Sequence, residues 1–76
     1  MKELVEVIAK ALVEHPDEVV VTETKDGADY LLELRVASSD MGKVIGKQGR
    51  IAKSIRAVVK SAASRENARA DVEIND

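Results

Sequence analysis

The stretch Val44-Ile45-Gly46-Lys47-Gln48-Gly49-Arg50-Ile51 contains two of the chain's four glycines, three residues apart and directly before a helical pattern. A single glycine would be enough for a turn. A nucleotide-binding P-loop needs four residues between its glycines, then Lys, then Ser or Thr, and this stretch departs from that motif. The two glycines need another explanation, and the neighbouring segments narrow the choice.

The segments before this stretch show first a helical and then a strand pattern. Apolar residues at helical spacing predict an amphipathic helix over about residues 2–14, ended by His15-Pro16. The β-branched run 19–25 predicts a strand, and Asp26-Gly27 predicts a type I′ turn after it. Apolar and polar side chains then alternate over residues 30–36. The two strands are expected to form an antiparallel hairpin.

The segments around and after the glycines complete the fold prediction. Ser38-Ser39-Asp40 offers candidate N-caps for a short helix that runs to about Ile45. A second helix is expected over about residues 50–65, and alternating residues 68–74 predict a third strand. A helical crossover of this length suits parallel strands. The predicted fold class is α+β: one domain over residues 1–76, in two layers and in the order α-β-β-α-α-β, with a three-stranded mixed sheet covered on one face by three helices.

The composition excludes several classes of site. The chain has no Cys, so it has no disulfides, thiolate metal sites or Cys nucleophiles, which fits a reducing cytoplasm. His15 has no second His to pair with as a metal ligand, and no serine has a plausible His partner. The acidic residues near the N-terminus interrupt any signal peptide or membrane span. We therefore predict no enzyme activity, no cofactor, no metal, no small-molecule substrate and no membrane association.

Charge is unevenly distributed along the chain. The net charge is −2, but residues 38–60 hold six basic side chains and one acidic one, which gives a local charge of +5. The six basic residues are Lys43, Lys47, Arg50, Lys53, Arg56 and Lys60. Binding depends on the local field at a patch and not on the total charge. A negatively charged partner near the two glycines is therefore consistent with the sequence.

Two interpretations of the glycine pair remain open on spacing alone. In the structural one, Gly46 caps a helix in a left-handed conformation and Gly49 eases the entry to the next helix. In the other, the missing side chains let a nucleic-acid backbone approach the start of the following helix, where the helix dipole favours a phosphate. The basic residues likewise suit either a solvated helix face or a phosphate-binding surface. Their grouping around one loop of an otherwise acidic chain favours the second interpretation.

The residues Val44 to Ile51, followed by Ile55, resemble the signature of the KH RNA-binding domain: an apolar pair, G-x-x-G, and a helix with apolar residues two and six places on. The element order is similar to that of the type II KH fold, and the resemblance, which is to the small stand-alone KH proteins of bacteria, covers essentially the whole chain. It implies that single-stranded RNA or DNA lies in a groove between the helices and the following strand. The implied RNA-binding residues are Gly46, Lys47, Gln48, Gly49, Arg50, Lys43, Ile45 and Lys53, with Val44 or Ile45 as the floor and Arg69 to Val72 as the far wall.

The resemblance also carries expectations about biology. It implies a post-transcriptional regulator or RNA chaperone, a homodimer, and association with a larger Jag-type KH protein. Tyr30 is the only aromatic residue, so the stacking platforms of other RNA-binding folds are absent. The alternative function is a protein-interaction module with a KH-like fold and little RNA binding. Whether the ligand is RNA or single-stranded DNA is left open by the sequence.

Overall fold

The computed structural model describes residues 1–76, apart from the side chain of Lys47. The elements are α1 (Lys2–Leu12), the 3-10 helix η1 (Pro16–Glu18), β1 (Val20–Asp26), β2 (Asp29–Arg35), α2 (Ser38–Arg65) and β3 (Arg69–Asn75). The predicted strands are confirmed to within one residue at each end, whereas η1 was not predicted. Neither α1 nor α2 is long and apolar enough to cross a membrane.

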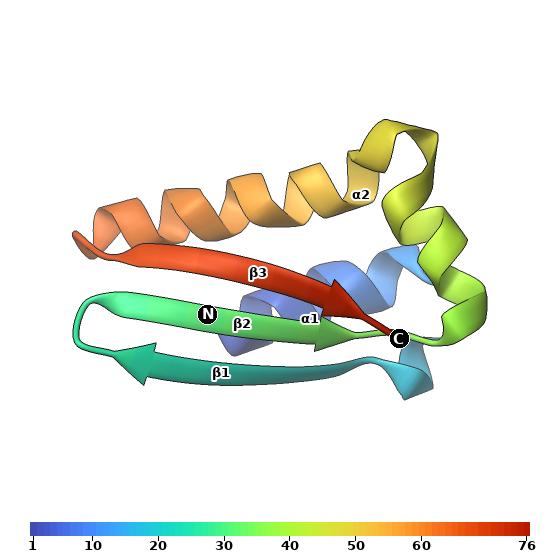
Figure 1. Ribbon diagram of the computed structural model, residues 1–76, viewed down its shortest axis with the longest axis horizontal. Coiled ribbons are helices and arrows are strands. Elements are labelled where there is room, and N and C mark those ends of the chain that lie inside the picture. The colour runs from blue at the N-terminus through green and yellow to red at the C-terminus, as the bar shows by residue number, and fades with distance from the viewer.

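The three strands form one mixed sheet in the order β1-β2-β3. The central strand β2 pairs antiparallel with β1 and parallel with β3, as the helical crossover between β2 and β3 predicts. In Figure 1, α1 lies behind the sheet while α2 runs along β3. The predicted two-layer α+β fold is therefore confirmed, and β1 and β3 are its edge strands.

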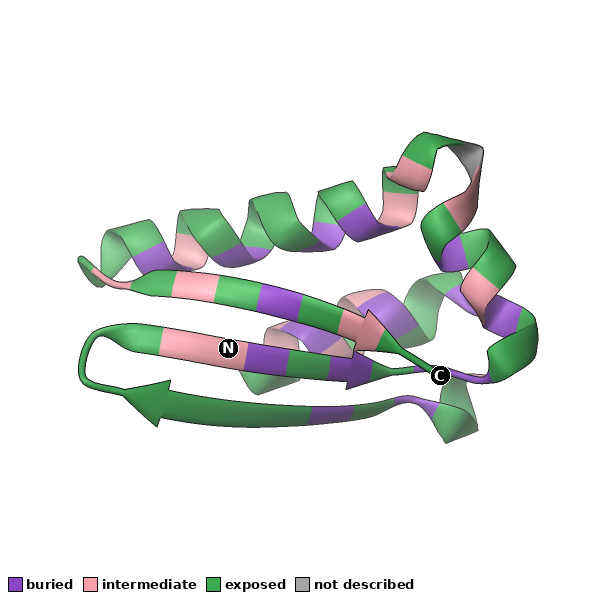
Figure 2. Cartoon of the chain, viewed as in Figure 1, coloured by how far each residue is buried: buried purple, intermediate pink, exposed green. Residues whose placement is uncertain are grey.

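The core lies between the sheet and the helices. Leu32 and Leu34 of β2 are fully buried, as are Ile55 of α2 and Val5 of α1. Between the two leucines, Glu33 points to the uncovered face of the sheet and is exposed, and Figure 2 shows this alternation along β2. The alternation in the sequence arises because one face of the strand packs on helices and the other meets solvent.

The hairpin turn differs from the prediction by one residue. Asp26 pairs with Asp29, so Gly27 and Ala28 are the turn residues. Only Gly27 has a positive φ, of 61°. A type I′ turn needs positive φ at both central positions, whereas a type II′ turn needs it at the first alone and favours glycine there. The type I′ prediction is wrong because it placed the glycine second in the turn.

Replacement of Gly27 by Ala is expected to lower the free energy of unfolding by about 1 kcal/mol, because a Cβ strains left-handed backbone. Nothing lies within 4 Å of a Cβ at this position, so no packing term is added. Urea denaturation measures the change. Gly42→Ala is the control, since Gly42 lies in α2 at an ordinary φ with equally open space, and it should stabilise the helix. Equal stability of the two variants would contradict the turn assignment.

The predicted pair of helices corresponds to the two arms of α2. Helix α2 is continuous from Ser38 to Arg65, but Gln48 and Gly49 have φ values of 64° and 69°. This left-handed backbone bends the helix sharply at Gln48 and Gly49. We call this bend the corner of α2, and Figure 1 shows it in yellow. We call residues 38–47 the first arm and residues 50–65 the second arm. Gly46 has no positive φ, so the expectation that it forms a left-handed cap is wrong.

The ends of the helices also depart from the prediction. The N-cap of α2 is Ala37, which makes no side-chain cap hydrogen bond, so none of the predicted caps has that role. Helix α1 ends at Leu12, before the expected His15-Pro16, because Val13 is already extended. At the other end of α2, Asn67 takes a φ of 55° and Ala68 donates to Ala63 O, which is a Schellman ending that returns the chain into β3.

Candidate nucleic-acid interface

The corner of α2 has a strained backbone and is exposed to solvent. Gln48 is not a glycine, yet it holds a left-handed φ, and its side chain is exposed. Such a conformation costs about 1 kcal/mol or more and persists where the surrounding structure enforces it, often at functional sites. Gly49 follows at a left-handed φ of 69°, which glycine adopts without steric cost. The corner is therefore a strained, solvent-facing part of the backbone.

The fold itself does not require Gly46. A Cβ placed on Gly46 would meet no atom within 4 Å, and its φ is not in the left-handed range. A glycine within a helix costs about 1 kcal/mol relative to alanine. Neither packing nor backbone conformation accounts for this residue, and the space beside its Cα is open.

The predicted site residues lie around the corner. Lys43 and Ile45 are on the first arm, and Arg50 and Lys53 are on the second arm; all four are exposed, Ile45 by 47%. Within the part of the chain that the structure describes, none of the three cations forms an ion pair. The side chain of Lys47 lies outside the described part. Exposed cations without acidic partners can neutralise phosphates.

The apolar pair before the glycines divides between two roles. Val44 is 1% exposed and belongs to the core, so it cannot line a groove. Ile45 points outward and offers an aliphatic surface instead. Of the two residues proposed for the floor of the groove, the structure leaves only Ile45 available to a ligand.

Asp40 positions the first arm of α2. The sequence indicated only a helix-capping role for this residue. Its carboxylate is buried, and Oδ1 and Oδ2 accept hydrogen bonds, each of 3.0 Å, from the backbone N–H groups of Glu14 and His15. His15 Nδ1 lies 3.5 Å from Oδ2. The N–H of Glu14, then that of His15 and the positive charges of His15 and Lys43, lower the pKa of Asp40 although burial opposes them. Asp40 thus joins the segment after α1 to the start of α2.

Arg56 fixes the second arm to the sheet edge. Its Nε and Nη2 both donate to the backbone oxygen of Val72 in β3, each at 3.4 Å. A cavity of about 190 Å³ opens beside this contact, lined by Arg56, Lys60, Ala70, Asp71 and Val72. Arg56 and Lys60, two basic residues of the second arm, therefore border the strand proposed as the far wall.

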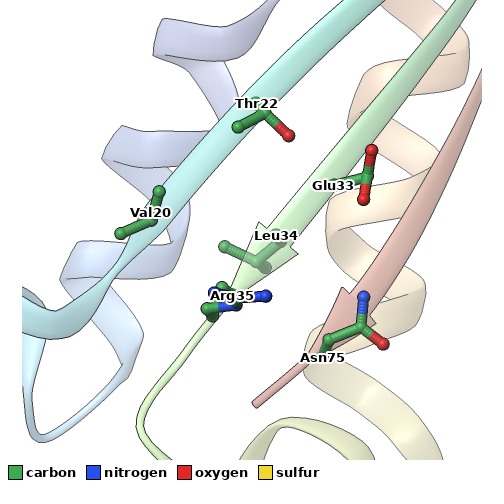
Figure 3. A pocket seen from close by; sticks show the side chains of 6 residues that line it. All are labelled: Val20, Thr22, Glu33, Leu34, Arg35 and Asn75. Carbon is green, nitrogen blue, oxygen red and sulfur yellow. The ribbon is translucent and has the colours of Figure 1, made fainter.

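Another cavity lies on the uncovered face of the sheet. It has a volume of about 180 Å³, and Figure 3 shows its lining: Val20, Thr22, Glu33, Leu34, Arg35 and Asn75. No residue of the corner contributes to it. Among the residues that the structure describes, no group of His, Asp and Glu side chains is arranged to hold a metal ion.

Nearly the whole chain matches a known protein family. Residues 2–74 match the family model described as "KhpA/KhpB, KH domain". The chain belongs to this KH-domain family. The G-x-x-G segment of the family resemblance is the corner of α2, and the type II element order is the order seen in the structure.

Curated relatives support the same assignment over their full length. A protein of Clostridium acetobutylicum is 62% identical over 74 residues, which cover 97% of this chain and 99% of the relative. One from Halalkalibacterium halodurans is 55% identical over 76 residues and covers 100% of both chains. One from Treponema pallidum is 47% identical over 75 residues, 99% of this chain and 94% of the relative. Each of these relatives is named RNA-binding protein KhpA.

Proposed function

We propose that this protein binds single-stranded RNA through the corner of α2. The observation that carries the proposal is Gly46, an open glycine that the fold does not need, beside a strained corner and exposed cations that form no ion pair within the described part of the chain. The names of the relatives support the same function. A phosphate group placed at the corner would lie at the positive end of the second arm's dipole.

Each residue at the corner has a proposed role. Gly46 and Gly49 let the RNA backbone approach, and Lys47 and Gln48 contact its phosphates. Lys43, Arg50 and Lys53 supply longer-range attraction, and Ile45 offers an aliphatic contact to a base. Tyr30 takes no part, because its hydroxyl donates to Oε1 of Glu66, which directly follows the second arm. Without aromatic stacking, we expect modest affinity and weak overall sequence preference.

The proposal also covers the biological setting. The whole chain would act as one KH domain, without enzyme activity, as a cytoplasmic regulator or chaperone of RNA. A homodimer and a larger Jag-type KH partner are proposed from the family resemblance alone. The alternative, a protein-interaction module, is favoured by exposed apolar side chains away from the corner, such as Val7, which is 67% exposed, and Val58, which is 38% exposed.

Replacement of Gly46 by Ala is expected to weaken RNA binding about tenfold, because a methyl group would stand where the RNA backbone approaches. The melting temperature should stay level or rise, since alanine favours the helix. Fluorescence anisotropy with a single-stranded RNA octamer and thermal melting measure the two effects. Gly42→Ala, one helical turn earlier in equally open space, is the matched control. Wild-type affinity in both variants, or no RNA binding by the wild type, would reject the proposal.

A further inference from the structure

The uncovered face of the sheet is open to solvent and carries two cavities. Both helices pack against the opposite face, so every second side chain of each strand is left without a covering layer. The smaller cavity, of about 180 Å³, is the one in Figure 3. The larger, of about 430 Å³, lies toward the hairpin turn, and its lining includes Leu31, Asp29 and Asp71. This face is therefore available to a partner molecule.

Exposed acidic side chains outnumber basic ones on this face. Those that the strand alternation places there are Asp26, Asp29, Glu33, Asp71 and Glu73. Two basic side chains, Arg35 and Arg69, share the face with them, which gives it a net charge of −3. A surface of this sign repels phosphates and attracts cations.

The register of the sheet places like charges side by side. Glu33 of β2 lies directly opposite Glu73 of β3. Side chains in register on one face are about 5 Å apart, and like charges at that distance destabilise a sheet. Asp71 is two residues before Glu73, so it lies on the same face beside the pair. In the part of the chain that the structure describes, none of these three carboxylates forms an ion pair. The fold gains no stability from this arrangement, whereas a cationic partner would.

We propose that the uncovered face of the sheet docks an extended, basic segment of another protein, with Lys or Arg at alternate positions. Alternate side chains of an extended chain point to one side about 6.6 Å apart, which is also the spacing of Asp71 and Glu73 along β3. One cation then faces Glu33 and Glu73, and the next faces Asp71. The aliphatic stems of these side chains pack on Leu31, which is partly exposed and opposite Asp71.

This surface is separate from the proposed RNA interface. No residue of the corner of α2 lines either cavity of the uncovered face. The two surfaces also differ in sign, since the exposed charges around the corner are Lys43, Arg50 and Lys53. The inference therefore goes beyond RNA binding and does not depend on it. A domain with both properties would join RNA to a basic protein.

The test is a titration of the isotope-labelled full chain with a decapeptide of alternating Lys and Thr, followed by heteronuclear NMR at moderate salt. The amide shifts are expected to concentrate in β2 and β3, with the largest changes near Glu33 and Glu73. A decapeptide of alternating Glu and Thr should cause no such shifts, because its carboxylates meet a surface of the same sign.

Glu33→Gln together with Glu73→Gln should weaken binding of the Lys-Thr peptide about fivefold, because the amides carry no charge. The same double variant should have a raised melting temperature without peptide, since the repulsion between the two carboxylates is gone. A purely structural role of the pair would not combine a more stable domain with weaker binding. Glu3→Gln with Glu18→Gln is the matched control, with the same charge change at exposed positions of α1 and η1, and it should keep the affinity.

Three results would overturn the inference. The first is the absence of shifts in β2 and β3 at millimolar peptide. The second is an equal loss of affinity in the two double variants. The third is a dimer in light scattering without peptide that Glu33→Gln with Glu73→Gln abolishes, because a second copy of the chain would then be the occupant of this face.

Discussion

Replacement of Asp40 by Asn is expected to lower the melting temperature of the domain by about 10 °C, a large loss for a chain of this size. Both carboxylate oxygens accept backbone N–H groups, from Glu14 and His15. An amide can satisfy only one of them and turns its own NH2 toward the other. The second N–H is then left buried without an acceptor, which costs more than the loss of an exposed hydrogen bond.

The pH dependence of stability gives a second measure of the same contact. The pKa of folded Asp40 lies below its ordinary value of 3.8, so the carboxylate stabilises the fold fully above about pH 4. This contribution disappears as the pH falls through the lowered pKa of the folded state. Stability of the wild type should therefore fall in that acid range more steeply than stability of Asp40→Asn.

Thermal melting by circular dichroism between pH 7 and pH 2 tests both effects. Asp17→Asn is the control, because Asp17 is an exposed carboxylate in η1 and undergoes the same charge change. It should melt within a few degrees of the wild type. If Asp40→Asn and Asp17→Asn melt alike, Asp40 does not hold the first arm in place.

The pattern of side chains predicts the sheet because local rules and tertiary packing agree there. Leu32 and Leu34 face the helices while Glu33 faces solvent, so the alternation of the sequence is the alternation of burial. The parallel pairing of β2 with β3 follows from the length of the helical crossover. The alternation depends on neighbouring residues and the pairing direction on the length of the crossover, so one sequence is enough to predict both.

The parts that the sequence does not reveal depend on distant partners. Asp40 reads as a helix cap because its true partners, the N–H groups of Glu14 and His15, lie 26 and 25 residues away. At the corner, Gln48 takes the left-handed conformation together with Gly49, and Gly46 does not. Residue preferences would have assigned that conformation to the two glycines. In the sequence Arg56 is one of six basic residues between residues 38 and 60, and its bond to Val72 O forms only once β3 is folded beside α2.

The most direct test of the central claim replaces Lys47 and Gln48 together by Asp. RNA binding at moderate salt is expected to fall about 100-fold, because two carboxylates would then face the phosphates at the corner. The fold should persist, since Gln48 is exposed. Thr24→Asp with Lys25→Asp is the matched control: it changes the net charge equally, at exposed positions on β1.

Binding of a single-stranded RNA octamer by these two double variants, with melting curves as the check on folding, decides the matter. The corner variant is expected to lose binding with a nearly unchanged melting temperature, while the β1 variant keeps most of its affinity. A corner variant that binds RNA as tightly as the β1 variant would contradict it, and RNA would then have to bind elsewhere on the molecule.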